Sequence, residues 1–165
     1  MEPVILDVDS ALGIRGGDID DAHAIAFMAG HVDRFPIAGI TVTAGNATRP
    51  SALKSAETIV KALKMNVEIA LGRDRPLKKP LVTGHSLVMG GSTVEEWILP
   101  EPTIHAAGND PATATPPRRD AIEFLADELR AGPRILLPTA PVSTIAAFLQ
   151  AHPELAKRIV RIVTM

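Results

Sequence analysis

The sequence contains no cysteine, which excludes disulfide bonds, thiolate metal sites and cysteine nucleophiles. Aromatic residues are scarce, with four Phe, one Trp and no Tyr among 165 residues, so a stacking platform for single-stranded nucleic acid is not expected. The formal net charge is only −2, so the chain has no strong field that would attract nucleic acid or an anionic membrane. The lack of cysteine fits a reducing compartment, and we expect a cytoplasmic protein.

Long apolar runs are also missing. No stretch reaches the length of about 20 residues that a membrane-spanning helix needs. The opening stretch "MEPVILDV" lacks the basic start and the long apolar segment of a signal peptide. The apolar share of 46% and the charged share of 22% are those of an ordinary globular protein. We therefore expect one domain over residues 1–165, with neither nucleic acid nor a membrane as partner.

Hydrophobic periodicity predicts strands that alternate with helices along the chain. Short apolar runs rich in β-branched residues predict strands at 3–8, 36–45, 67–71, 134–139 and 159–165. Apolar residues at helical spacing predict helices at 20–31, 49–64 and 118–131, and one or two helices within 141–158. This alternation predicts an α/β fold with an open, mostly parallel sheet flanked by helices.

The segment from Gly72 to Pro117 interrupts this alternation. It is rich in Gly, Pro, Thr and Ser and contains "GHSLVMGGST" and "NDPATATPP". Connections of this length without regular structure are uncommon and are usually functional or disordered. We expect the segment to pass over one edge of the sheet.

Acidic residues gather near the start of the chain. Asp7 and Asp9 stand at the carboxyl end of the first expected strand, and Asp20 and Asp21 begin the first expected helix. Strand ends and the helix starts that follow them lie at the same sheet edge, where four carboxylates would repel one another. A hard divalent cation such as Ca²⁺ or Mg²⁺ would relieve this repulsion. In the alternative interpretation the acids only cap the helix and solvate a loop, but capping needs a single Asp.

Three stretches resemble the inosine-uridine preferring nucleoside hydrolase family, in the order in which that family has them. The stretch "ILDVDS…DIDDAHAIAFM" resembles its N-terminal signature, in which Asp-x-Asp and Asp-Asp-Ala flank a loop. The stretch "GITVTAGNAT" resembles the second strand, which ends in Gly-Asn, and "ILLPTAPVSTIAAFLQAHPELAKRIVRIVTM" resembles a later strand, turn, helix and strand. The resemblance implies a nucleoside hydrolase-like, Rossmann-like fold and hydrolysis of the N-glycosidic bond of ribonucleosides.

The resemblance also implies a role for individual residues. It implies that Asp9 binds Ca²⁺ and activates the attacking water, and that Asp21 is a bidentate metal ligand. It implies that Asp20 binds a ribose hydroxyl and that Asn46 faces the ribose and the nucleophile. Thr139 would complete the metal shell with its backbone carbonyl, and Asp7 would be a supporting group.

The sequence departs from the family pattern in three respects. The loop "SALGIRGG" is longer than usual and resembles that of one branch of the family. The turn Gly-Pro-Leu-Thr-Asn is replaced by residues 140–144, so that Thr144 stands where the family has an amide. The family's later Asn-bearing loop and its C-terminal His-Asp would follow Met165. We therefore expect the N-terminal half of the fold, poor hydrolysis by this chain alone, and association as a homo-oligomer or with a C-terminal half.

Two other functions remain open at this point. The stretch "ILDVDSAL" also resembles the strand end of haloacid dehalogenase-like phosphatases, in which the first Asp is a nucleophile beside Mg²⁺. That interpretation leaves Asp20 and Asp21 without a role. The other possibility is a non-catalytic module that binds a metal or ribose.

Overall fold

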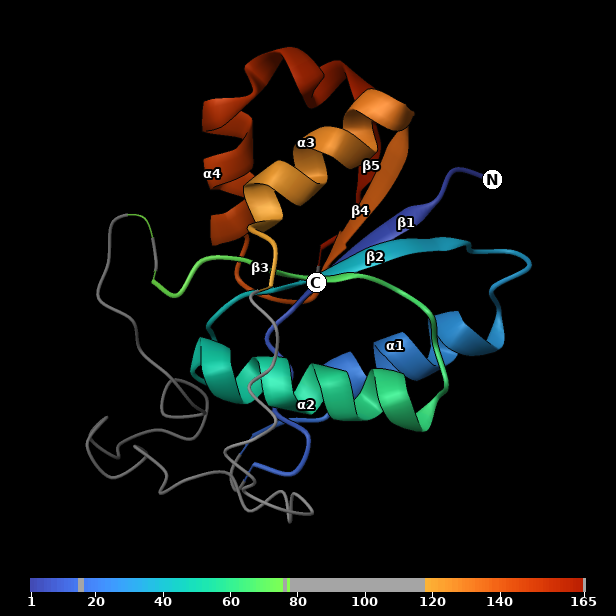
Figure 1. Ribbon diagram of the computed structural model, residues 1–165, viewed down its shortest axis with the longest axis vertical. Coiled ribbons are helices and arrows are strands. Elements are labelled where there is room, and N and C mark those ends of the chain that lie inside the picture. The colour runs from blue at the N-terminus through green and yellow to red at the C-terminus, as the bar shows by residue number, and fades with distance from the viewer. Residues whose placement is uncertain (15–16, 76, 78–117, 165) are drawn as a thin grey trace.

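The computed structural model describes residues 1–14, 17–75, 77 and 118–164 of the chain (Figure 1). Within these ranges the strands are β1 (Val4–Val8), β2 (Ile37–Val42), β3 (Ile69–Leu71), β4 (Arg134–Pro138) and β5 (Ile159–Ile162). The helices are α1 (Asp20–Gly30), α2 (Arg49–Ala62), α3 (Ala121–Ala131), α4 (Ser143–Ala151) and the 3₁₀ helix η3 (Pro153–Arg158).

The described strands form one sheet with the order β3-β2-β1-β4-β5, and every neighbouring pair is parallel. Helices α1 and α2 cover one face of the sheet, and α3 and α4 cover the other (Figure 1). The predicted open parallel sheet flanked by helices is therefore confirmed. The central strand β1 has neighbours on both sides, so its carboxyl end lies in the middle of the edge where ligands of such sheets bind.

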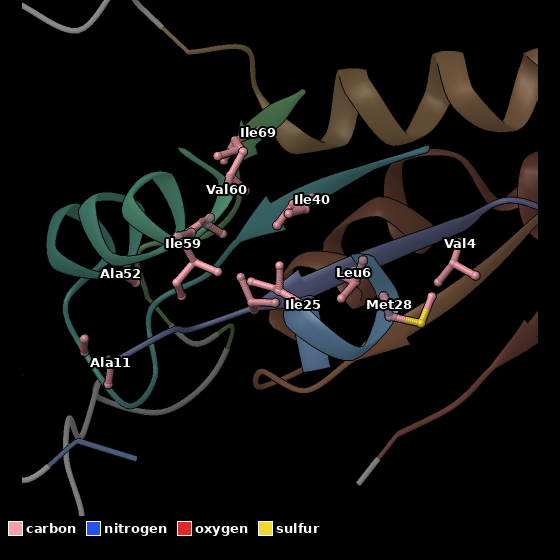
Figure 2. Packing of buried hydrophobic residues seen from close by; sticks show 14 residues of the cluster. Val4, Leu6, Ala11, Ile25, Met28, Ile40, Ala52, Ile59, Val60 and Ile69 are labelled. Carbon is pink, nitrogen blue, oxygen red and sulfur yellow. The ribbon is translucent and has the colours of Figure 1, made fainter. Parts of the chain in front are cut away.

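Strand β1 is buried on both faces, as its run of apolar residues, broken only by Asp7, predicts. Val4, Leu6 and Val8 pack in the core beneath α1 and α2, while Ile5 packs with α3 and α4. Figure 2 shows Ile25 and Met28 of α1 directed toward β1. The period of two along β1 therefore places Asp7 on the face of Ile5, toward α3 and α4.

The elements depart from the predicted bounds at a few ends, for local reasons. Helix α3 begins at Ala121, because the Asp120 side chain accepts hydrogen bonds from the N–H groups of Ile122 and Glu123 and so caps the helix. The expected helical stretch 141–158 divides into α4 and η3 where Pro153 removes a backbone donor. Strand β5 ends at Ile162. Most of the predicted excursion, residues 76 and 78–117, lies outside the described residues.

None of the helices in the described ranges has both the length and the apolar character to cross a membrane.

Candidate functional site

The predicted acidic residues meet at the carboxyl edge of the sheet. Asp7 belongs to the end of β1 and Asp9 follows it, while Asp21 lies in the first turn of α1. Asn46 follows β2, and Thr139 directly follows β4. Because β1 lies between β2 and β4, the loops after all three strands converge on the same point.

Asp9 and Asp21 form the centre of this cluster. The backbone N–H of Asp9 donates to Oδ2 of Asp21 over 3.1 Å. The Thr139 hydroxyl donates a short hydrogen bond to Oδ1 of Asp21. The residues Asp9 and Asp21 are only 3% and 1% exposed, so water does little to stabilise their charges. The structure thus brings together the three residues that the resemblance assigns to a metal.

Asn46 bridges Asp9 to a further acid, Asp18. Its backbone N–H donates to Oδ2 of Asp9 over 2.6 Å, and its side-chain Nδ2 donates to Oδ2 of Asp18 over 2.8 Å. The same Nδ2 lies 3.5 Å from Oδ1 of Asp9. Asn46 therefore orients the Asp9 carboxylate through its backbone N–H, and its side-chain amide fixes Asp18.

Asp7 lies deeper in the sheet, beside the threonines of β2. Its Oδ1 accepts hydrogen bonds from the hydroxyls of Thr41 and Thr43, at 2.6 Å and 3.1 Å. Its Oδ2 is buried and has no hydrogen-bond partner among the described residues. The backbone oxygen of Asp7 accepts from the N–H groups of Thr139 and Ala140. The backbone of Asp7 therefore holds the turn that carries Thr139.

Asp20 lies at the same edge, but its side chain is turned back onto its own helix. Its Oδ1 accepts a hydrogen bond from the N–H of Asp21 over 2.8 Å. A carboxylate at this position is also stabilised by the positive end of the helix dipole.

Burial raises the proton affinity of the cluster. It raises the pKa of Asp7 from 3.8 to about 7, although the threonine hydroxyls act in the opposite direction. It also raises the pKa of Asp9, Asp18 and Asp21, and repulsion between neighbouring acids adds to this effect. None of these carboxylates forms an ion pair with a basic side chain in the described part of the chain.

The raised pKa of Asp7 predicts how the stability of the metal-free chain depends on pH. Below pH 4 the carboxyl is protonated in both the folded and the unfolded state. As the pH rises toward 7, the unfolded chain releases this proton first, so the free energy of unfolding falls. A shift from 3.8 to about 7 corresponds to a loss of about 4 kcal/mol.

This effect is measured by urea unfolding between pH 4 and pH 8 in the wild type and in Asp7→Asn. The substitution removes the titration and keeps the shape, so the stability of the wild type should fall relative to that of the variant as the pH rises. A constant difference between the two proteins would contradict the burial of Asp7.

The donor set fits a hard divalent cation only in part. No group of three or more His, Asp or Glu side chains within the described residues is arranged to hold a metal ion. Two of the four predicted acids are engaged elsewhere. The Asp7 carboxylate accepts hydrogen bonds from two threonine hydroxyls, and the Asp20 carboxylate accepts one from the first turn of its own helix. Asp9 and Asp21 remain, two buried carboxylates that pair with no basic side chain in the described ranges. Their oxygens match the preference of Ca²⁺ for oxygen ligands. Because Ca²⁺ takes about six to eight such ligands, carbonyls, waters or substrate would have to supply the others.

Asp18, Thr43 and Thr144 take part in the site although the sequence assigned them no role. Asp18 belongs to the loop before α1, and residue spacing alone does not place the side chain of a loop residue. Thr41 pairs with Asp7 in the β1–β2 register, and Thr43 lies two residues further on the same face. The period of two in "TVT" was the signal that could have identified Thr43.

Comparison with known proteins gives matches over nearly the whole chain. The model of the family described as inosine-uridine preferring nucleoside hydrolase matches residues 4–165. The pyrimidine-specific ribonucleoside hydrolase RihA of Shewanella oneidensis is 32% identical over 166 aligned residues, covering 99% of this chain and 46% of the relative. The Salmonella arizonae protein of the same name is 31% identical, with 99% and 47% covered. The chain thus spans about half the length of the curated relatives it matches.

Solved structures give the same result for the fold. A purine-preferring ribonucleoside hydrolase from Gardnerella vaginalis superposes with a TM-score of 0.70 at 24% identity, covering 99% of this chain and 48% of the other. The inosine-uridine preferring nucleoside hydrolase from Bacillus anthracis gives a TM-score of 0.65 at 21% identity, with 100% and 50% covered. The fold of this chain is therefore that of about half of these proteins.

Proposed function

Since the chain belongs to the inosine-uridine preferring nucleoside hydrolase family, we propose that it hydrolyses the N-glycosidic bond of ribonucleosides, with water attacking the anomeric carbon of the ribose. The observation that supports this most is the pair of buried carboxylates, Asp9 and Asp21, at the centre of the sheet edge. Asn46 on one side and Thr139 on the other hold these carboxylates by hydrogen bonds.

Asp9 is the proposed general base. Its carboxylate is oriented by the backbone N–H of Asn46, which holds it in position to accept a proton from a water molecule at this edge of the sheet. The Asn46 side chain is proposed to contact the ribose and the attacking water. Asp20 is proposed to bind a ribose hydroxyl. The remaining negative charge of the cluster would stabilise the positive charge that develops on the sugar ring.

A Ca²⁺ ion is the proposed cofactor, held by the carboxylates of Asp9 and Asp21 and by the backbone carbonyl of Thr139. When bound, such a cation lowers the pKa of water and so makes it a nucleophile at neutral pH. Asp7 fixes the backbone of Thr139 through its carbonyl oxygen, and Asp9 takes up the proton that the attacking water loses.

We further propose that residues 1–165 form a single domain, the N-terminal part of the family fold, in the cytoplasm. Strand β5 and the residue after it expose three apolar side chains, Val160, Ile162 and Val163, each more than 40% exposed. An exposed apolar edge strand of this kind can pair with a strand of another chain. Its proposed partner is a second copy of this chain or a C-terminal half of the fold.

The two alternatives receive less support. A haloacid dehalogenase-like phosphatase would need Asp7 as an exposed nucleophile, but Asp7 is 2% exposed and bonded to two threonine hydroxyls. A non-catalytic module is consistent with the contacts of the cluster, and differs from the proposal in one respect: it would bind Ca²⁺ or ribose without releasing a base.

The test is an assay for free ribose with inosine, uridine and cytidine as substrates. We expect little release by the chain alone and, once the C-terminal half of a family relative is added, release that requires a divalent cation and stops on addition of a chelator. The chain is assayed alone and mixed with the purified C-terminal half of a family relative, with p-nitrophenyl phosphate as the control substrate. Release of phosphate without ribose would contradict the proposal, and Ca²⁺ binding without ribose release in either preparation would favour the non-catalytic module.

A further inference from the structure

A chain of hydrogen bonds, the hydroxyl relay, crosses the tips of three neighbouring strands beside the proposed site. Its members are Arg73, Thr144, Thr43 and Asp7. It begins at the backbone N–H of Arg73, after β3, which donates to Oγ1 of Thr144 over 2.9 Å. Oγ1 of Thr144, in the first turn of α4, forms a short hydrogen bond with Oγ1 of Thr43, after β2. Oγ1 of Thr43 then donates to Oδ1 of Asp7, in β1. The segments joined in this way are more than 130 residues apart in the sequence.

The chemistry of these groups fixes the direction of every bond. The N–H of Arg73 can only donate, and each threonine hydroxyl carries a single hydrogen. The hydrogen of Thr43 points to Asp7, so the hydrogen between the two threonines comes from Thr144. All three bonds therefore point toward the Asp7 carboxylate. Bonds aligned in this way polarise one another, which strengthens the last one.

The relay is closed to water. Thr144 is 0% exposed, Thr43 is 1% exposed and Asp7 is 2% exposed. A buried polar atom that loses its partner stays unsatisfied because no solvent replaces the bond. Removal of one hydroxyl therefore disturbs the next member of the relay as well as the site of the change.

Gly72 packs directly against the two hydroxyls. A Cβ on this residue would lie 2.4 Å from Oγ1 of Thr144 and 2.6 Å from Oγ1 of Thr43. The Gly72 backbone is held on both sides, since its N–H donates to the oxygen of Val42 and its oxygen accepts from Nη1 of Arg49 at 2.8 Å. The backbone after β3 is thus held against the relay.

We propose that Thr43 and Thr144 are positioning residues, which hold the Asp7 carboxylate in place and link it to the backbone of Arg73. Asp7 in turn holds Thr139 and Ala140 through its carbonyl oxygen, next to Asp21. The importance of this relay for catalysis rests on the proposed function. That the relay holds the Asp7 carboxylate in place does not depend on the proposed function. Thr144 stands where the resembled family motif has an amide, so the hydroxyl relay is a feature of this sequence.

The test is NMR of the metal-free 165-residue chain at one fixed pH, with two signals followed. In Thr144→Val the amide hydrogen of Arg73 should exchange about fivefold faster or more, as expected for the loss of one net hydrogen bond. The side-chain carboxyl ¹³C signal of Asp7 should also shift, although Thr144 makes no hydrogen bond to Asp7. The variant Thr144→Ser keeps the hydroxyl and should restore both signals.

Ser55→Ala is the matched control, because Ser55 is a buried hydroxyl that bonds to Ser10 outside the relay. It should leave both signals unchanged. If Thr144→Val does not fold, Thr43→Val interrupts the same relay and must move the Asp7 signal. An unchanged Asp7 signal in a folded variant, or no restoration by Thr144→Ser, would overturn the proposal. Failure of the proposed function would instead be seen as absent ribose release, which these signals do not depend on.

Discussion

The Asp9→Asn variant is expected to release ribose about 10²- to 10⁴-fold more slowly than the wild type, the range typical of a lost general base. Asparagine has nearly the same shape and can still interact with Asn46, but its amide cannot accept the proton of the attacking water. The neutral side chain also weakens the proposed cation site that Asp9 shares with Asp21. The measurement is the initial rate of ribose release from inosine in the presence of Ca²⁺, with the wild type and the variant each mixed with the C-terminal half of a family relative.

Two controls separate the proposed roles of Asp9. Asp33→Asn removes a charge from an exposed residue after α1 and should keep the rate within threefold of the wild type. A titration with excess Ca²⁺ distinguishes the base from the ligand, because an absent base is not replaced by more metal. A rate for Asp9→Asn that returns to the wild-type value at high Ca²⁺ would show that Asp9 acts only as a ligand.

Gly45→Ala should have the second large effect, although it removes no functional group. A Cβ on Gly45 would lie 1.9 Å from Oδ2 of Asp9 and 2.8 Å from Cδ of Pro141. The Asp9 carboxylate must therefore move away, and it loses its hydrogen bond from the N–H of Asn46. A displacement of about 1 Å at a reacting group commonly costs about 10²-fold in rate. Overpacking of this kind also lowers the free energy of unfolding by about 1 to 3 kcal/mol.

Gly30→Ala is the matched control for this substitution, since a Cβ there meets no atom within 4 Å. Both variants are compared by ribose release and by urea unfolding. The expected pattern is a large loss of rate in Gly45→Ala and wild-type behaviour in Gly30→Ala. A Gly45→Ala variant with the wild-type rate would mean that the position of the Asp9 carboxylate does not matter for the reaction.

The main features of the fold could be predicted because they depend on short-range patterns. Apolar runs and helical spacing located every described strand and helix to within a few residues. The convergence of Asp9 and Asp21 followed from one topological rule, which places strand ends and the next helix starts at one edge, whereas Thr139 was assigned to the site only through the family resemblance. Neither step required knowledge of a side-chain conformation.

The rest of the site depends on contacts between residues far apart in the sequence. Asp18 reaches Asn46 across a loop whose path the sequence did not define. Thr144 reaches Thr43 over 101 positions, and only the packing of α4 on the tip of β2 brings them together. Asp20 lies at the predicted edge, but the local hydrogen bond to the N–H of Asp21 fixes its side chain. The outcome of such competition between local and distant partners cannot be deduced from residue spacing.

The cluster of acids also explains why a cation is expected at all. Burial of several carboxylates without basic partners is costly, and the raised pKa of each buried acid is a measure of that cost. A bound divalent cation removes the cost and would favour the ionised form of every member. We therefore expect Ca²⁺ to stabilise the chain most at neutral and higher pH, where the metal-free protein is weakest.

The most direct test of a cation between Asp9 and Asp21 is a crystal of this chain soaked in Ca²⁺. The predicted result is an anomalous difference peak at about 2.3 to 2.6 Å from carboxylate oxygens of both residues and from the backbone oxygen of Thr139. A soaked crystal with no peak at this position, or with Ca²⁺ bound only elsewhere on the chain, would contradict it.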